Sequence, residues 1–230
     1  MKALVLSSGG IDSTTCLGLA IQKYGKENVI SASLYYGQKH DKELECARKI
    51  AEYYGIRHIE DDVSGVMKYA SQVCTLMKGG KEIKHESYEQ QIKENGFVDS
   101  YVPFRNGLFL SIAAAYAVSL FPNMECEIYY GAHADDAAGN AYADCTPEFS
   151  KAMGEAINLG TYNRVKVVSP FIDYTKAMVV RVGLDLQAPY HLTWSCYEGH
   201  EKQCGVCGTC RDRKAAFEAN GVKDPVEYES

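Results

Sequence analysis

ALVLSSGGIDSTT, residues 3–15, decides the fold, because it passes from an apolar run through a glycine-bearing turn into a helix-like pattern. A strand that leads into such a turn exposes several backbone N–H groups together with a helix N-terminus, and both attract an anion. We therefore predict a strand, a loop and a helix here, with a phosphate group as the ligand of the loop.

The residue types of this loop suit such a ligand. Gly9 and Gly10 permit backbone conformations with positive φ and let the main chain approach an oxygen closely. Ser8 and Ser13 can add hydroxyl donors. Asp12 would repel a polyphosphate unless a cation lay between them, so we interpret it as a residue that helps to place Mg²⁺. Capping of the helix is the alternative role for Asp12.

The segment SGGIDS, residues 8–13, is shorter than the GxxxxGK[ST] loop of mononucleotide-binding proteins and carries no lysine. It resembles the loop of the PP-loop ATP pyrophosphatases, which implies that ATP binds here by its pyrophosphate. An ordinary strand-turn-helix with a serine cap is the alternative. The residues assigned to ATP are Ser7, Ser8, Gly9, Gly10, Ile11, Asp12, Ser13, Thr14, Thr15, Cys16 and Leu17, of which Thr14 and Leu17 are included only as neighbours of the loop.

Composition narrows the class of protein. The chain of 230 residues is long enough for one large α/β domain, alone or with a small appendage. No apolar run reaches the roughly 18 residues of a membrane span, and the start MKALVLSSGG leaves no room for a signal peptide, so we expect a cytoplasmic protein. A net charge of −6 argues against a nucleic-acid-binding face and favours small-molecule ligands. Nine cysteines, an odd number, do not suit a disulfide framework.

Apolar strand-like runs alternate with helical periodicity along most of the chain, which is typical of a parallel sheet covered on both faces. We predict a three-layer, Rossmann-like α/β domain over residues 1–185 and a small C-terminal lobe over 186–230. Residues 65–96 are polar and charged, and we interpret them as an insertion or mobile lid of the first domain. After the first unit, strands are expected at 29–35, 57–59, 127–130 and 166–168, and helices at 41–54, 108–120 and 174–186.

Four cysteines of the C-terminal lobe have the spacing of a metal site. Cys204, Cys207 and Cys210 are separated by two residues each, and Cys196 precedes them. Such short gaps let tight turns aim the sulfurs at one metal, and four thiolates satisfy tetrahedral Zn²⁺. Because a closed shell leaves no position for water, we expect this Zn²⁺ to be structural. An iron–sulfur cluster and a redox-active disulfide are the alternatives.

Further segments extend a resemblance over nearly the whole chain. SGGIDSTTCL (8–17) is followed by YGQKH (36–40), YVPFRN (101–106), DCTPEF (144–149) and LTWSC (192–196), ahead of the cysteine cluster. This order resembles the 7-cyano-7-deazaguanine synthases of queuosine biosynthesis. The resemblance implies ATP-dependent conversion of 7-carboxy-7-deazaguanine and ammonia into the nitrile, on a fold similar to the adenine-nucleotide α-hydrolases. It also implies Mg²⁺ with ATP, one Zn²⁺ per chain and a homodimer.

The matched positions supply candidate site residues, and Lys176 is added because it follows Thr175 at a predicted helix start. The catalytic set is Asp12, Ser13, Arg105 and Lys176, and the substrate-binding set is Tyr36, Gln38, Arg105, Asn106 and Asp144. Arg105 can bind a carboxylate bidentately and Asn106 can orient it. Asp144 can accept hydrogen bonds from the guanidine-like edge of a deazapurine. Lys176 can neutralise phosphate charge, with a solvated surface lysine as the alternative.

Other residues near these positions allow two interpretations. His40 follows the second strand and could transfer protons, or it could be a capped or solvated residue at a helix start. Trp194 could stack on a purine, although packing in the zinc lobe is the simpler role. Asp135 and Asp136 could also bind the deazapurine edge, or they could be helix caps and surface acids.

Residues 131–146, GAHADDAAGNAYADCT, depart from the usual family pattern GVNAVDYSGYPDCR. The proline before Asp144 is absent and the loop differs in length, so the substrate stays open at this point. Another deazapurine amide-forming enzyme and a tRNA-modifying adenylating enzyme with a PP-loop are the alternatives. A noncatalytic adenine-nucleotide sensor is a third. The acidic charge disfavours the tRNA enzyme, and the cysteine cluster disfavours the sensor.

Overall fold

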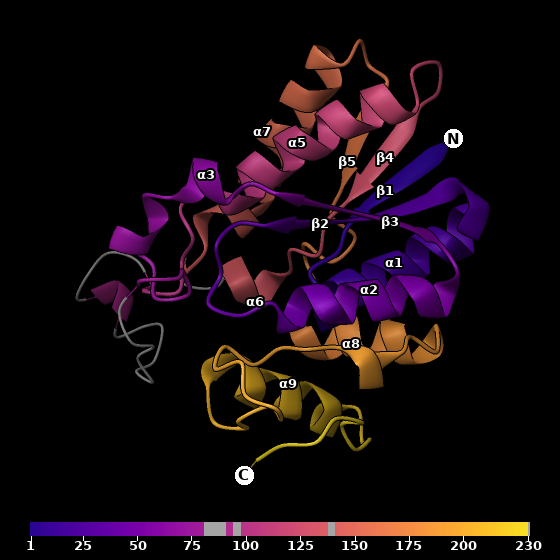
Figure 1. Cartoon of the computed structure of the whole chain (residues 1–230). Helices are drawn as coiled ribbons and strands as arrows, with labels where there is room; N and C mark the ends of the chain where they lie inside the picture. Colours follow the sequence, from indigo (N-terminus) through magenta and orange to yellow (C-terminus); the bar gives the residue numbers. More distant parts are fainter. Residues whose placement is uncertain (81–90, 94–97, 138–140, 230) are drawn as a thin grey trace.

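A parallel β-sheet forms the centre of the protein (Figure 1). The computed structural model describes residues 1–80, 91–93, 98–137 and 141–229. Five strands pair in the order β3-β2-β1-β4-β5, and every pair is parallel. They are β1 (Lys2–Leu6), β2 (Val29–Tyr35), β3 (Arg57–Asp62), β4 (Cys126–Tyr129) and β5 (Val165–Val168). The strand order reverses between β1 and β4, because the chain builds outward from β1 to β3 and then returns to the other side of β1.

Helices cover both faces of this sheet. α5 and α7 lie on one face, whereas α1, α2 and α8 lie on the other, with α9 outside α8 (Figure 1). The helices are α1 (Ile11–Tyr24), α2 (Lys42–Tyr54), α3 (Ser64–Met67), α5 (Arg105–Leu120), α6 (Ala134–Ala137), α7 (Pro147–Gly160), α8 (Lys176–Asp185) and α9 (Gly208–Ala219), with 3₁₀ turns η1 (Lys26–Asn28), η2 (Ala70–Gln72), η4 (Ala143–Cys145) and η5 (Tyr190–Leu192). The predicted three-layer, Rossmann-like α/β fold is confirmed. No helix within the described ranges has both the length and the apolar character that a membrane crossing requires.

The central strand β1 is apolar on both sides because both faces of the sheet are covered. Ala3 and Val5 belong to the hydrophobic core that α1 and α8 complete, and Leu4 belongs to the core under α5. Successive side chains of a strand point to opposite faces, and a strand buried on both faces has a continuous apolar sequence. The run at residues 3–6 therefore predicts the strand correctly.

Several predicted boundaries shift in the structure. The strand predicted at 57–59 continues to Asp62, because β3 pairs with β2 over its whole length. The helix predicted at 108–120 begins at Arg105. Helices α7 and α9 are absent from the predicted elements, although α7 has a signal in the sequence. Thr146 caps α7 by accepting a hydrogen bond from Phe149 N, and Pro147 occupies the first turn.

The predicted insertion at 65–96 lies partly within the described residues. Its first part contains α3 and η2 and forms a small hydrophobic cluster with the end of β2 and the start of α5. The buried members of this cluster are Tyr36, Met67, Ala70, Cys74, Met77 and Val102. Residues 81–90 and 94–96 of the predicted insertion lie outside the described part of the chain. A lid function for the segment stays a prediction.

A buried arginine holds the C-terminal segment together. Arg213 of α9 is completely buried and donates two hydrogen bonds to the carboxylate of Asp224, at 2.7 and 2.9 Å. The same guanidinium donates to Thr193 Oγ1 at 2.7 Å and to Tyr190 O at 3.2 Å. Nearby, Phe217 of α9 lies in the same hydrophobic cluster as residues of α1 and α8. The C-terminal segment thus shares its packing with the main sheet.

We expect Asp224→Asn to lower the free energy of unfolding by about 3 kcal/mol, because it leaves the buried Arg213 guanidinium without its counter-charge. Denaturant unfolding would measure this change. Asp185→Asn is the matched control, since the Arg181–Asp185 pair is exposed and should contribute less than about 1 kcal/mol. Equal stability losses in the two variants would contradict the prediction.

Candidate active site

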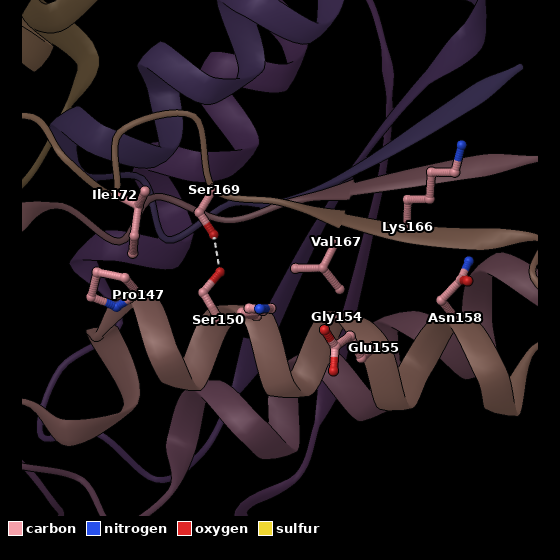
Figure 2. Close-up of a pocket in the computed structure, with 10 residues that line it drawn as sticks. Pro147, Ser150, Gly154, Glu155, Asn158, Lys166, Val167, Ser169 and Ile172 are labelled. Carbon is pink, nitrogen blue, oxygen red and sulfur yellow. Dashed lines mark hydrogen bonds between the residues drawn. The ribbon is translucent and has the colours of Figure 1, made fainter.

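A cavity of about 730 Å³ opens at the carboxyl ends of β1, β2 and β4. In open parallel sheets, ligands bind where the strand order reverses, which here is the gap between β1 and β4. A second, more open hollow of about 450 Å³ lies between α7 and β5, where the hydroxyls of Ser150 and Ser169 hydrogen-bond at 2.6 Å (Figure 2). None of the predicted site residues line that hollow. The cavity at the strand ends is therefore the candidate site.

Close contacts hold the N-terminal loop, residues 7–10, between β1 and α1. Gly9 has a φ of 84°, and a Cβ atom there would lie 2.2 Å from the carbonyl oxygen of Glu43 in α2. Trp194, in the C-terminal segment, donates a hydrogen bond from its backbone N to Gly9 O at 3.0 Å. Ser13 Oγ accepts a hydrogen bond from Ser8 N at 3.2 Å and closes the turn. The structure thus contains the strand, loop and helix that the sequence predicts.

Asp12 lies in the first turn of α1, at the centre of a charged cluster. Lys176 Nζ donates a hydrogen bond to Asp12 Oδ2, and His133 Nε2 lies 3.8 Å from Asp12 Oδ1. Burial by itself would raise the pKa of Asp12, but the Lys176 ammonium and His133 outweigh it and hold this pKa below its usual value. Asp12 Oδ1 is buried and has no hydrogen-bond partner in the described part of the chain. An ionised, unpartnered oxygen of this kind suits a bound cation.

Three more carboxyl groups surround Lys176 and His133. Asp136 Oδ2 lies 3.3 Å from His133 Nε2, and Asp135 Oδ2 accepts a hydrogen bond from Lys176 N at 2.7 Å. Asp212 of α9 lines the same cavity. Burial raises the pKa of Asp136 and of Asp212, although the nearby Lys176 and His133 oppose both shifts. Asp135 and Asp136 therefore lie in the same charged cluster as Asp12 and are not isolated surface acids.

The other half of the cavity contains the predicted substrate-binding residues, all of which line its wall. Arg105 begins α5, and its guanidinium carbon lies 5.8 Å from the ring centre of Tyr36. Asn106 donates two hydrogen bonds to Asp144, from N to Oδ2 at 2.9 Å and from Nδ2 to the carbonyl oxygen at 3.1 Å. Burial raises the pKa of Asp144, although the Asn106 N–H and Arg105 oppose the shift. Gln38 Oε1 accepts a hydrogen bond from Tyr36 N at 3.0 Å.

The four cysteines predicted to bind metal form a cluster next to this cavity. The Sγ atoms of Cys196, Cys204, Cys207 and Cys210 lie within 4.8 Å of one another, and all four residues are buried. Backbone N–H groups point at the sulfurs, with Cys204 N donating to Cys196 Sγ and Cys207 N donating to Cys204 Sγ, both at 3.3 Å. Such hydrogen bonds favour the thiolate form, so the cluster could hold a metal ion.

Comparison with known proteins relates this site to a family. The family model described as queuosine biosynthesis protein QueC matches residues 2–221. The chain belongs to the QueC family. It is 43% identical over 227 residues to the 7-cyano-7-deazaguanine synthase of Archaeoglobus fulgidus, with 98% of this chain and 90% of that protein covered. It is 40% identical over 229 residues to the 7-cyano-7-deazaguanine synthase of Marinomonas sp., with 100% and 99% covered.

Solved structures of other proteins share the fold of this QueC-family chain. The NMN synthetase from Francisella tularensis has a TM-score of 0.52 at 16% identity, with 96% of this chain and 78% of that chain covered. The U34-tRNA thiolase NcsA from Methanococcus maripaludis has a TM-score of 0.52 at 18% identity, with 96% and 67% covered. At such identities the likeness concerns the fold alone.

The structure separates the residues predicted to bind ATP into two groups. Those that line the cavity are Ser7, Ser8, Gly10, Ile11, Asp12 and Ser13. Gly9 of the loop is buried and does not line it. Thr14, Thr15, Cys16 and Leu17 are buried in α1 and do not line it either. Thr15 Oγ1, for example, bonds with Ile11 O at 2.8 Å and with the Tyr190 hydroxyl at 2.7 Å. The helical turn directs these residues into the protein interior, so adjacency to the loop in sequence does not bring them to the cavity.

His133, Glu43 and Asp212 are charged or titratable residues that line the cavity but are absent from the predicted site. His133 had a signal in the sequence, because it follows a predicted strand at the ligand-binding edge of the sheet. Glu43 had a weaker signal, since it lies in the first turn after the segment YGQKH. Asp212 had none, because α9 reaches the cavity only through tertiary packing.

Gly131 is expected to reject a side chain, because Asp12 packs against it. A Cβ at Gly131 would lie 2.8 Å from Asp12 Cβ and 3.0 Å from Asp12 C, so the first turn of α1 would have to move. We expect Gly131→Ala to destabilise the fold by about 1–3 kcal/mol and to weaken ATP binding in calorimetric titration. Gly160→Ala is the matched control, since nothing lies within 4 Å of its Cβ position. An unchanged ATP affinity in Gly131→Ala would show that Asp12 needs no such contact.

Proposed function

We propose that this protein is an ATP-dependent ligase that converts 7-carboxy-7-deazaguanine and ammonia into 7-cyano-7-deazaguanine in queuosine biosynthesis. One observation carries the proposal. A single cavity joins the N-terminal loop and Asp12 to Arg105 and Asp144, in a QueC-family chain whose full-length relatives are named 7-cyano-7-deazaguanine synthases. Reaction between ATP and an acid requires both groups to be held side by side.

The N-terminal loop and the first turn of α1 are proposed to bind the pyrophosphate of ATP. Backbone N–H groups, the N-terminus of α1 and the hydroxyls of Ser8 and Ser13 offer donors to phosphate oxygens. Asp12 and Asp136 would hold Mg²⁺, because both line the cavity and Asp12 Oδ1 has no other partner among the described residues. Bound there, Mg²⁺ would neutralise phosphate charge. Lys176, which contacts Asp12, would add a second positive charge.

The opposite half of the cavity is proposed to bind the deazapurine acid. Arg105 would hold the substrate carboxylate bidentately. The Arg105 guanidinium contacts Asn106 Oδ1 at 3.4 Å and the ring of Tyr36, and no carboxylate of the described residues forms a salt bridge with it. A bound acid would therefore meet no competing ion pair at this guanidinium. Asp144 would accept hydrogen bonds from the guanidine-like edge of the ring, and the two hydrogen bonds from Asn106 would keep Asp144 in place. Tyr36 and Gln38 complete this wall.

The reaction needs two activations, because a carboxylate is a poor electrophile and both of its oxygens must leave. In the first, the carboxylate attacks the α-phosphorus of ATP and pyrophosphate departs. Ammonia then displaces AMP and gives the amide with loss of a proton. In the second, ATP activates the amide oxygen, and elimination with loss of the remaining N–H protons gives the nitrile. Lys176, which hydrogen-bonds to Asp12, and the loop N–H groups would stabilise negative charge on the phosphate oxygens.

The cysteine cluster is proposed to bind one structural Zn²⁺ per chain. Zn–S bonds of about 2.3 Å in a tetrahedron place the sulfurs about 3.8 Å apart. The Sγ atoms of Cys204 and Cys210 are 3.9 Å apart, and all four Sγ atoms lie within 4.8 Å, so the cluster fits this metal. Four thiolates would complete the metal's coordination, and the metal would anchor the tail without taking part in the reaction.

The setting of the enzyme follows from the same proposal. We propose a cytoplasmic homodimer that acts on small molecules and does not bind nucleic acid. It would have a main domain over 1–185, with an insertion or lid over 65–96, and a zinc lobe over 186–230. The likeness to a tRNA thiolase concerns the fold alone, and the net charge of −6 favours small-molecule substrates over tRNA. In the divergent segment 131–146, His133 and Asp136 lie beside Asp12, whereas Asp144 faces the other half of the cavity.

Product analysis tests this function. We expect the purified protein with ATP, Mg²⁺, ammonium and 7-carboxy-7-deazaguanine to release pyrophosphate and the nitrile. In Asp12→Asn the rate of nitrile formation should fall by at least about 10²-fold. The reason is that a neutral amide side chain in place of this carboxylate would leave the cation without an anionic ligand from α1. A melting curve checks that the variant folds. Wild-type turnover of a different acid would overturn the substrate assignment, and a normal rate in Asp12→Asn would remove Asp12 from the mechanism.

Removal of zinc should destabilise the protein. Because metal binding to four thiolates can contribute on the order of 10 kcal/mol to folding, we expect the melting temperature to fall after chelation and to recover when Zn²⁺ is added back. ATP affinity should fall as well, since Trp194, two residues before Cys196, is hydrogen-bonded to Gly9. An unchanged melting curve after verified metal loss would show that the tail folds without the metal.

A further inference from the structure

Glu43 lines the cavity, and its carboxyl group has no role in the reaction steps described above. It lies in the first turn of α2 and is partly buried. Its backbone carbonyl packs against Gly9, which ties Glu43 to the N-terminal loop. Arg105 lines the same cavity, and its positive charge acts to lower the pKa of Glu43. Glu43 therefore lies between the segment that would hold the phosphates and the group that would hold the acid.

The surroundings of Glu43 leave its carboxyl group available. Within the described part of the chain this carboxyl group takes part in no hydrogen bond or salt bridge. Burial raises the pKa of Glu43 to about 7, and Arg105 opposes this shift. A carboxyl group with such a pKa can exchange a proton readily near neutral pH.

We propose that Glu43 is the ammonium-binding residue and the general base of the amide-forming step. The inference rests on the function proposed above, and it names the site of the second substrate. Ammonia exists mainly as ammonium near neutral pH, and ammonium cannot attack a carbon because its nitrogen has no lone pair. A carboxylate beside the activated acyl carbon would attract the cation and accept its proton.

The proton balance of the step is complete. Ammonium gives one proton to the Glu43 carboxylate, and the resulting ammonia forms the new C–N bond. The C–O bond to AMP breaks, and AMP leaves with the electron pair of that bond. The amide nitrogen then loses one proton to solvent and is neutral. Glu43 returns its proton to solvent before the next turnover, so no additional reactant is needed.

A different role for Glu43 would be structural. As a counter-charge to Arg105, it would position the guanidinium and affect binding of the acid. That role predicts a loss of adenylation, because the acid would be misplaced before ammonia arrives. The proposed role predicts normal adenylation and a loss that is confined to the reaction with ammonium. The two roles are therefore separable in one set of assays.

The experiment compares Glu43→Gln with wild type in three assays at neutral pH. Acid-dependent exchange of labelled pyrophosphate into ATP reports adenylation, and we expect it to be unchanged. Amide formation from ammonium chloride should fall by about 10²-fold, the contribution of a general base. Hydroxamate formation from hydroxylamine should be retained, because hydroxylamine is largely uncharged at this pH and attacks without a base.

Glu45→Gln is the matched control, since Glu45 is exposed on the same turn of α2 and does not line the cavity. Normal amide formation in Glu43→Gln would overturn the assignment. A parallel loss of exchange, amide and hydroxamate would also overturn it, in favour of the counter-charge role. If wild type itself showed no acid-dependent exchange, the proposed function would fail, which is a distinct result from failure of Glu43 alone.

Discussion

Two close backbone approaches, at Gly9 and Gly131, hold the N-terminal loop, and the rest of the site depends on them. At Gly9 the loop meets the first turn of α2, and at Gly131 the turn after β4 meets Asp12. A side chain at either position would press against backbone atoms, which cannot yield as a flexible side chain can. Because β1, β2 and β4 end at the same edge of a parallel sheet, these contacts bring groups from three strands into one cavity.

The charges of the cavity explain why the proposed phosphate ligand would need a cation beside it. Asp12, Asp135 and Asp136 gather around Lys176 and His133. Carboxylates outnumber the permanent positive charge of this cluster, so a bare polyphosphate would be repelled. A divalent cation between the carboxylates and the phosphates would reverse that balance. Lys176 keeps Asp12 ionised at the same time, which preserves its capacity to bind such a cation.

The C-terminal tail contributes to the site as well as to the fold. Trp194 connects the two, since its backbone N–H binds Gly9 O and its indole N–H donates to Cys196 O at 2.7 Å. Arg213 fixes the same segment through Thr193. A metal ion at the cysteines and an ion pair in the lobe would therefore both restrict the position of the N-terminal loop, although neither touches the reacting groups.

The sequence by itself determined the features that depend on residues close together along the chain. Alternation of strand and helix patterns predicted the fold class, and the spacing from Cys204 to Cys210 predicted the metal cluster. Resemblance in short segments pointed to Arg105, which the structure places in the cavity. Only the tertiary structure decided that Glu43 and Asp212 reach the same cavity, and that the helix residues after Ser13 face inward. The physical reason is that a local pattern records which face of an element is buried, whereas convergence of side chains from α2, α6 and α9 is set by the packing of the whole sheet.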